Sequence, residues 1–308
     1  MSGCDKPGLM PVEAALARLL AQAEASAIVE TERVSLSEAA GRVLAEPLIA
    51  TLDLPPWANS AMDGYALRLA DWNGEPLVVS QRIQAGSAPA PLQPGTCVRI
   101  FTGAPLPAGA DTVEMQENAV VGEDGRVAFS EPLKLGQNVR AQGQETRIGD
   151  SVLPAGTRLG PIELGLAASL GCAELTVRRR PRVAVLSTGD ELVEPGQPLG
   201  PGQIYNSNRC LLIAWLQRLG CEVVDGGILL DDLELTRKAL GALSDVDLIL
   251  STGGVSVGEA DFLGLALREE GELALWKLAI KPGKPLTCGQ FRGVPVIGLP
   301  GNPASTLV

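Results

Sequence analysis

"LILSTGGVSVGEADF", residues 248–262, begins as a buried strand and ends in paired carboxylates. The apolar residues 248–250 are followed by a glycine pair at 253–254, and Glu259 and Asp261 lie near the end of the stretch. Glycines allow a backbone to approach a ligand closely, and ligands of open parallel sheets bind beyond the carboxyl ends of the strands. The stretch therefore predicts a core strand that carries a binding loop to the edge of a sheet.

Short apolar segments and amphipathic segments alternate around this stretch, which is typical of a parallel sheet with helices on both faces. We predict a doubly wound α/β domain with a mostly parallel sheet over residues 182–308. The expected strands are 183–187, 221–224, 248–252, 275–280 and 294–299, and the expected helices are 209–220 and 234–244.

The N-terminal half has a different texture. Its periodicity predicts a helix over residues 11–26, and Ser35 and Glu38 have the capping-box spacing that precedes a short helix. Short β-rich pieces separated by Pro and Gly then predict a β-rich inserted domain at residues 51–141. We expect residues 1–50 and 142–178 to form an elongated α+β first domain around it.

Composition excludes several functions. The chain of 308 residues is 45% hydrophobic and has a net charge of −11, which argues against nucleic-acid binding. The basic run at 178–182 is interpreted as a surface connection between domains. We expect neither a membrane span nor a signal peptide, and we interpret the six cysteines as reduced thiols of a cytoplasmic protein.

Histidine is absent from the sequence, so acid–base chemistry and metal binding fall to Asp, Glu and Lys. The loops at 186–192, 250–261 and 297–303 each follow a predicted strand, and we expect them to share one sheet edge. Their carboxylates favour a hard cation such as Mg²⁺, although capping of helix N-termini is the alternative for them. Lysines at 277, 281 and 284 either neutralise a phosphate or are solvated surface residues.

The sequence also resembles a known family, the molybdopterin molybdotransferases, which include the enzymatic domain of gephyrin. The resemblance implies a transferase that inserts molybdate into adenylylated molybdopterin with Mg²⁺ and releases AMP. It also implies a homodimer that works with the molybdopterin adenylyltransferase and with cofactor-accepting enzymes. The matching stretches are "PPWANSAMDGYA" (55–66), "RIFTGAPLPAGAD" (99–111), "GQNVRAQGQE" (136–145), "STGDEL" (187–192), "GQIYNSNR" (202–209), "STGGVSVGEAD" (251–261), "WKLAIKPGKP" (276–285) and "GLPGNP" (298–303).

The same resemblance implies roles for individual residues. Three of them, Glu191, Asp231 and Asp261, are the expected Mg²⁺ ligands. The expected catalytic set is Asp63, Thr102, Glu145, Glu191, Asp231, Asp261, Lys277 and Lys281. The expected substrate-binding set is Ser187, Thr188, Gly189, Ser251, Gly253, Gly254, Ser256, Lys284, Pro300, Gly301 and Asn302.

The sequence is also compatible with two other functions. A molybdopterin adenylyltransferase is expected to share the α/β domain but to lack the "NSAMDGYA" region, and a gephyrin-like scaffold is expected to carry a receptor-binding extension. The family continues beyond the position of Val308 into a small C-terminal β domain, which we expect this chain to lack.

Overall fold

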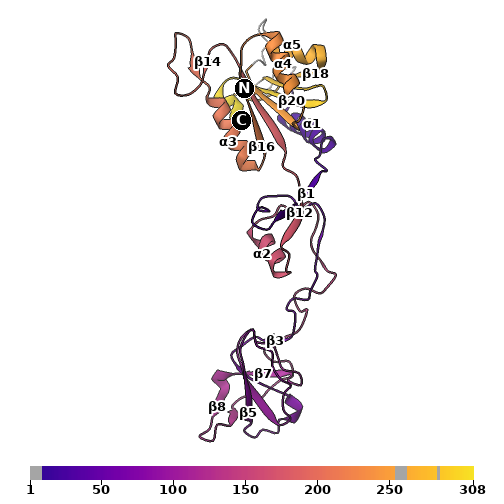
Figure 1. The fold of residues 1–308 in the computed structure, drawn as a ribbon, viewed down its shortest axis with the longest axis vertical. Coiled ribbons are helices and arrows are strands. Elements are labelled where there is room, and N and C mark those ends of the chain that lie inside the picture. The colour runs from indigo at the N-terminus through magenta and orange to yellow at the C-terminus, as the bar shows by residue number, and fades with distance from the viewer. Residues whose placement is uncertain (1–8, 254–261, 283–284) are drawn as a thin grey trace. The chain divides into compact units, whose positions relative to one another are not determined.

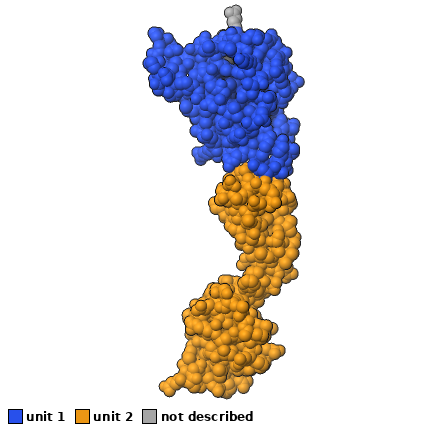
Figure 2. Space-filling model, viewed as in Figure 1, with its two compact units in different colours: residues 1–32, 178–308 blue, residues 33–177 orange. Residues whose placement is uncertain are grey.

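The computed structural model describes residues 9–253, 262–282 and 285–308. The chain divides into two compact units (Figures 1 and 2). Unit 1 comprises residues 1–32 and 178–308, and unit 2 comprises residues 33–177. No helix among the described residues is long and apolar enough to cross a membrane.

Unit 1 contains a six-stranded sheet with the order β16-β13-β17-β20-β19-β18. The first four strands in this order are parallel, and β19 is antiparallel to both β20 and β18. The strands are β13 (Arg182–Thr188), β16 (Glu222–Leu229), β17 (Leu248–Thr252), β18 (Gly271–Lys277), β19 (Pro285–Phe291) and β20 (Val294–Leu299), and a separate parallel pair is formed by β14 (Leu192–Val193) and β15 (Ile204–Tyr205). The helices are α1 (Val12–Ala25), α3 (Ser207–Leu219), α4 (Leu233–Ala242), α5 (Phe262–Glu270) and α6 (Pro303–Leu307).

Strand β13 shows why helices cover both faces of this sheet. Successive strand residues point to opposite faces, and β13 is apolar at successive positions. Val183 and Val185 pack in one core with residues of α3, whereas Ala184 and Leu186 pack in a second core with residues of α4 and α5. The predicted α/β fold is confirmed.

Helix α1 lies in unit 1, which differs from the expected first domain of residues 1–50. The reason is a strand-like contact: the Met10 N–H donates to the Lys277 carbonyl at 2.7 Å, and the Ala279 N–H donates to the Met10 carbonyl at 2.8 Å. The Arg18 guanidinium also lies 5.7 Å from the centroid of the Trp276 ring. Residues 1–32 are therefore grouped with the α/β sheet.

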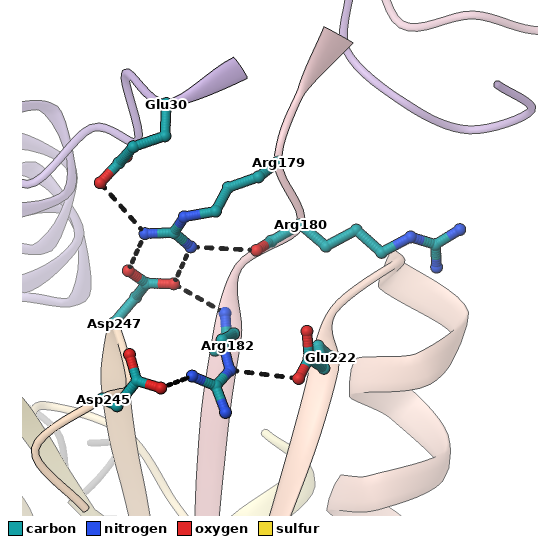
Figure 3. Close-up of polar contacts among 7 residues, drawn as sticks. All are labelled: Glu30, Arg179, Arg180, Arg182, Glu222, Asp245 and Asp247. Carbon is teal, nitrogen blue, oxygen red and sulfur yellow. Dashed lines mark hydrogen bonds and ion pairs between the residues drawn. The ribbon is translucent and has the colours of Figure 1, made fainter. Parts of the chain in front are cut away.

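Two arginines of the basic run at 178–182 are neutralised within unit 1 (Figure 3). Arg179 donates to both carboxylate oxygens of Asp247 at 2.7 and 2.8 Å and lies 3.5 Å from Glu30 Oε1. The backbone N–H of Arg182 donates to Asp247 at 2.7 Å, and its guanidinium pairs with Asp245. This network lies at the amino ends of β13 and β17 and holds them together.

The Arg179 hydrogen bonds hold the pKa of Asp247 below its usual value. A depressed pKa stabilises the fold above the unfolded-state pKa of about 3.9, and this contribution is lost as the pH falls through the folded-state value. We expect Asp247→Asn to lower the free energy of unfolding in urea by about 2 kcal/mol at pH 7 and by progressively less in acid.

Asp245→Asn is the matched control for this prediction, because Asp245 pairs with Arg182 but its side chain is 90% exposed. Its effect should stay within about 0.5 kcal/mol. Equal effects of the two substitutions at pH 7 would contradict the assignment of Asp247 as the centre of the network.

One part of unit 2 consists of short strands and one helix around a common core. The strands are β1 (Thr31–Ser35), β2 (Leu48–Ile49), β11 (Ser151–Leu153) and β12 (Glu174–Arg178), and the helix is α2 (Pro161–Ser169). β1 pairs with β12 and β2 pairs with β11, and the boundary between the units falls inside β1 and β12. Buried Leu44, Leu159 and Val177 belong to the core between them.

The predicted short helix after Ser35 is wrong. The capping-box contact does form, because Ser35 Oγ donates to Glu38 Oε2 at 2.7 Å. However, residues 36–38 make only a turn, and the chain then bridges to the strand region through Leu44 and Val177. The Ser35–Glu38 contact therefore stabilises a turn. The residues that would continue a helix are instead drawn into β bridges, such as the one between Leu44 and Val177.

The other part of unit 2 lies between β2 and β11 in the sequence and is rich in strands. Its four-stranded sheet has the order β5-β6-β4-β7, in which β5 and β6 are parallel and β4 is antiparallel to both of its neighbours. All four residues of β4 are buried. The elements are β3 (Asn59–Ser60), β4 (Gly64–Leu67), β5 (Val78–Ile83), β6 (Thr96–Ile100), β7 (Thr112–Met115), β8 (Ala119–Val121), β9 (Val127–Phe129), β10 (Val139–Arg140) and the 3₁₀ turns η1 (Leu69–Asp71) and η2 (Gln116–Asn118).

Candidate functional site

Three loops meet at the carboxyl edge of the parallel strands in unit 1. β13, β17 and β20 are neighbours and end at Thr188, Thr252 and Leu299. The Gly253 N–H donates to the Leu299 carbonyl at 3.1 Å, and a Cβ on Gly253 would lie only 2.4 Å from the Thr188 carbonyl oxygen. Glycine at 253 is therefore required for the loops to pack against one another.

A pocket of ≈ 210 Å³ lies among these loops and the start of α3. Of the predicted substrate-binding residues, Thr188, Gly253 and Gly301 line it, and so does Glu191. Several lining residues are not among the predicted site residues, chiefly Tyr205, Asn206 and Asn208 at the β15–α3 junction. The junction lies in the stretch 202–209 that carries part of the family resemblance, and an Asn before an amphipathic segment also signals a helix cap.

Several other predicted residues at this edge are buried or take part in hydrogen bonds within the protein. Ser187 and Ser251 are fully buried, and Ser187 Oγ lies 3.1 Å from Thr252 Oγ1. Asn302 caps α6, because its side chain accepts a hydrogen bond from the Ala304 N–H at 2.9 Å. Pro300 lies beside it, and its carbonyl accepts a hydrogen bond from Thr306 Oγ1 at 2.6 Å. Gly254, Ser256, Asp261 and Lys284 lie outside the described residues.

Carboxylates gather beside the pocket. The pKa of Asp231 is raised, first by burial and then by the negative charges of Asp190 and Glu191. Asp190 Oδ1 also accepts a hydrogen bond from the Asp231 N–H at 3.1 Å. Among residues 9–253, 262–282 and 285–308, no three metal-ligating side chains are grouped closely enough to hold an ion. Of the three predicted metal ligands, the structure describes Glu191 and Asp231, because Asp261 lies outside the described residues.

The predicted lysines lie at the same edge but away from the pocket. β18 runs in the same direction as β20, so its last residue, Lys277, lies at the carboxyl edge two strand positions away. Adjacent strands are about 4.8 Å apart, which makes this lateral separation about 10 Å. Lys277 and Lys281 are both exposed, and among the described residues no lysine or arginine lines the pocket.

Unit 2 brings two predicted catalytic residues together. Asp63 precedes β4 and Thr102 follows β6, and the register that pairs Gly64 with Ile100 places them side by side. Asp63 Oδ1 accepts hydrogen bonds from the Thr102 N–H at 2.8 Å and from Thr102 Oγ1 at 2.7 Å. These bonds, led by the backbone one, lower the pKa of Asp63, so the group is a carboxylate at neutral pH.

Glu145 is not part of this pair. It lies in an exposed turn, where its backbone N–H donates to the Leu54 carbonyl at 2.8 Å. Within the described residues its side chain makes no hydrogen bond or ion pair with Asp63 or Thr102. Its catalytic role stays a prediction.

A parallel sheet whose neighbouring strand ends surround a pocket defines the class of doubly wound α/β ligand-binding domains. Residues 184–308 match a family described as a probable molybdopterin binding domain. Residues 10–171 match the family described as the MoeA N-terminal region, domains I and II.

Individual proteins give the same result. The chain is 47% identical over 282 residues to a molybdopterin molybdenumtransferase of Haemophilus influenzae, covering 91% of this chain and 70% of that protein. It is 43% identical to the enzyme of that name from Nostoc sp., covering 91% of this chain and 66% of that protein. A solved molybdopterin biosynthesis MoeA structure from Pyrococcus horikoshii OT3 superposes with a TM-score of 0.80 at 30% identity, covering 97% of this chain and 76% of that chain. The chain belongs to the molybdopterin molybdenumtransferase family.

Proposed function

We propose that this protein is an enzyme of molybdenum cofactor biosynthesis that inserts molybdate into adenylylated molybdopterin and releases AMP. The observation that carries the proposal is the match of both halves of the chain, at residues 10–171 and 184–308, to the two families. The α/β domain alone would fit an adenylyltransferase equally well. The region that carries Asp63 and Thr102 favours the molybdenum-inserting reaction.

A comparison of two reactions tests this proposal. With adenylylated molybdopterin, molybdate and Mg²⁺, we expect release of AMP, measured by chromatography. With molybdopterin and ATP, we expect no pyrophosphate. Pyrophosphate release in the second reaction would support the adenylyltransferase alternative, and inactivity in both would support a scaffold.

We propose Mg²⁺ as the metal, with Glu191 and Asp231 among its ligands and Asp261, which lies outside the described residues, as a third. Carboxylate oxygens are the ligands that this hard cation prefers. Burial, and after it the negative charges of Asp190 and Glu191, raise the pKa of Asp231, and a cation beside these carboxylates would offset that repulsion. When bound, Mg²⁺ would neutralise phosphate charge, while Glu191 and Asp231 would hold it beside the pocket.

Asp231→Asn should remove most of the stabilisation that Mg²⁺ gives to the protein. A ligand that binds only the folded state stabilises it by about 2.7 kcal/mol at 100 times its Kd. We expect the wild-type melting temperature to rise on addition of Mg²⁺ and that of the variant to rise by less than half as much. Without Mg²⁺ the variant should melt slightly higher, because one of three repelling charges is gone.

Asp232→Asn is the control for this measurement. Asp232 caps α4 by accepting a hydrogen bond from the Leu235 N–H at 2.8 Å, and Asn caps helices equally well. Its Mg²⁺ response should equal that of the wild type. An equal Mg²⁺-induced shift in Asp231→Asn would remove Asp231 from the ligand set.

We further propose a cytoplasmic homodimer that exchanges substrate and product with an adenylyltransferase and with cofactor-accepting enzymes. Family membership supports this proposal. Sedimentation equilibrium distinguishes the dimer from a monomer, and a monomeric mass across the working concentration range would contradict it.

A further inference from the structure

The start of α3 places two buried amide side chains on the wall of the pocket. Asn206 and Asn208 are 2% and 6% exposed, and both line it. Each uses one half of its amide inside the protein. Asn206 Oδ1 accepts a hydrogen bond from the Arg209 N–H at 3.3 Å, and Asn208 Nδ2 donates to the Gly301 carbonyl at 2.8 Å.

The other halves of both amides are unpaired. Asn206 Nδ2, a donor, and Asn208 Oδ1, an acceptor, are buried and make no hydrogen bond within the described residues. Buried polar atoms are nearly always paired in folded proteins, and here two unpaired ones belong to residues that line the same pocket. A bound ligand that pairs both atoms accounts for them.

The chemistry of the wall indicates which part of a substrate it takes. A phosphate offers only acceptors, so it would leave Asn208 Oδ1 unpaired. The Glu191 carboxylate also lines the pocket, and no described lysine or arginine does. An anionic group inside the pocket is therefore disfavoured by the Glu191 charge, and we place the phosphates beside the pocket, where the proposed Mg²⁺ would offset that charge.

The pocket has a volume of ≈ 210 Å³, below the roughly 300–1,000 Å³ of sites for drug-sized ligands. This volume suits one ring system better than a whole nucleotide. A nitrogen heterocycle that carries an acceptor beside an N–H donor matches both amide halves. Both the 2-amino-4-oxo edge of a pterin and the amino-bearing edge of adenine offer such a pair.

We propose that Asn206 and Asn208 recognise the edge of a nitrogen heterocycle, so that this pocket holds a ring of the substrate and its phosphates lie outside. The choice of pterin and adenine as candidate rings rests on the proposed function. The geometry of the amide pair does not depend on it.

Ligand-observed NMR titrations of the whole chain test the inference with three probes: 6-hydroxymethylpterin, adenosine and inorganic pyrophosphate. We expect one of the two heterocycles to bind, and which one binds identifies the ring. Asn206→Ser keeps a helix-capping oxygen but withdraws the amide donor, and Asn208→Ser withdraws the amide acceptor. Each should raise the Kd of the bound heterocycle about tenfold, the size of one hydrogen bond, and leave the pyrophosphate response unchanged.

Asn73→Ser is the matched control, because Asn73 is exposed in unit 2 and its Oδ1 likewise accepts a backbone hydrogen bond, from the Glu75 N–H at 3.1 Å. It should bind the heterocycle as the wild type does. Binding of neither heterocycle, or equal affinity in both pocket variants, overturns the inference even if AMP release is intact. Heterocycle binding without AMP release would instead count against the proposed function alone.

Discussion

Asp63→Asn is expected to lower molybdate-dependent AMP release at least about 100-fold, because we propose Asp63 as a catalytic carboxylate and loss of such a group usually has an effect of this size. Asparagine keeps an Oδ1 that can accept both hydrogen bonds from Thr102, at 2.8 and 2.7 Å in the wild type. The substitution therefore removes the negative charge and preserves the local geometry. Because the pKa of Asp63 is lowered, that charge is present throughout the neutral pH range.

Asp111→Asn is a closely matched control in the same unit. Asp111 Oδ1 also accepts one backbone bond, from the Leu69 N–H at 2.8 Å, and one threonine bond, from Thr112 Oγ1 at 2.9 Å. We assign it no catalytic role, so its variant should retain AMP release within a few-fold. A wild-type rate in Asp63→Asn at saturating molybdate and Mg²⁺ would show that the carboxylate is not required.

Gly64→Ala, one residue further along, should have the largest effect on stability. A Cβ at this position would lie 1.8 Å from the Glu114 carbonyl oxygen and 3.1 Å from the Met115 Cα. These are backbone atoms of the edge strand β7, so the clash separates β7 from β4. We expect a loss of about 3 kcal/mol or more in the free energy of unfolding in urea.

Gly165→Ala provides the opposite expectation within the same unit. Gly165 lies inside α2, and a Cβ there would meet no atom within 4 Å. Alanine in a helix interior should gain up to about 1 kcal/mol over glycine. If Gly64→Ala unfolds at the same urea concentration as the wild type, the close approach of β4 to β7 is wrong.

The α/β core was predictable because its strands are buried on both faces. Residues 183–187, 248–252 and 294–299 are nearly continuous apolar runs, and they form β13, β17 and β20. Residues 209–220 gave α3 within two residues at its start, since its apolar spacing is helical and Gly220 ends it in the left-handed conformation. In these segments local pattern and tertiary burial indicate the same structure.

Strand β19 was not predicted, and its sequence explains why. Pro285, Gly289 and Gln290 interrupt any apolar alternation, yet the strand pairs with neighbours on both sides. A Cβ on Gly289 would lie 2.2 Å from the Glu272 carbonyl oxygen, so the glycine permits the close pairing. Pairing with β18 and β20 determines this strand, and the local sequence pattern carries no information about that pairing.

The candidate site divides in the same way. Asp63 and Thr102 were predicted from the family motifs, and the structure joins them by hydrogen bonds between segments 39 residues apart. Asn206 and Asn208 lie in the matching stretch 202–209 but were assigned no role, because a motif match does not show which side chains keep unpaired polar atoms. Their unpaired buried atoms can be identified only from the folded structure, in which the loops after β13, β17 and β20 form the pocket that these residues line.

The most direct test of molybdenum insertion is the dependence of AMP release on molybdate at a fixed concentration of Mg²⁺. Purified protein is incubated with adenylylated molybdopterin while molybdate is varied from zero to saturation, and AMP is quantified over time. We predict a saturable rise in the AMP rate with molybdate in the wild type, and a flat response near the background rate in Asp63→Asn. An AMP rate in the wild type that does not change with molybdate would contradict the account.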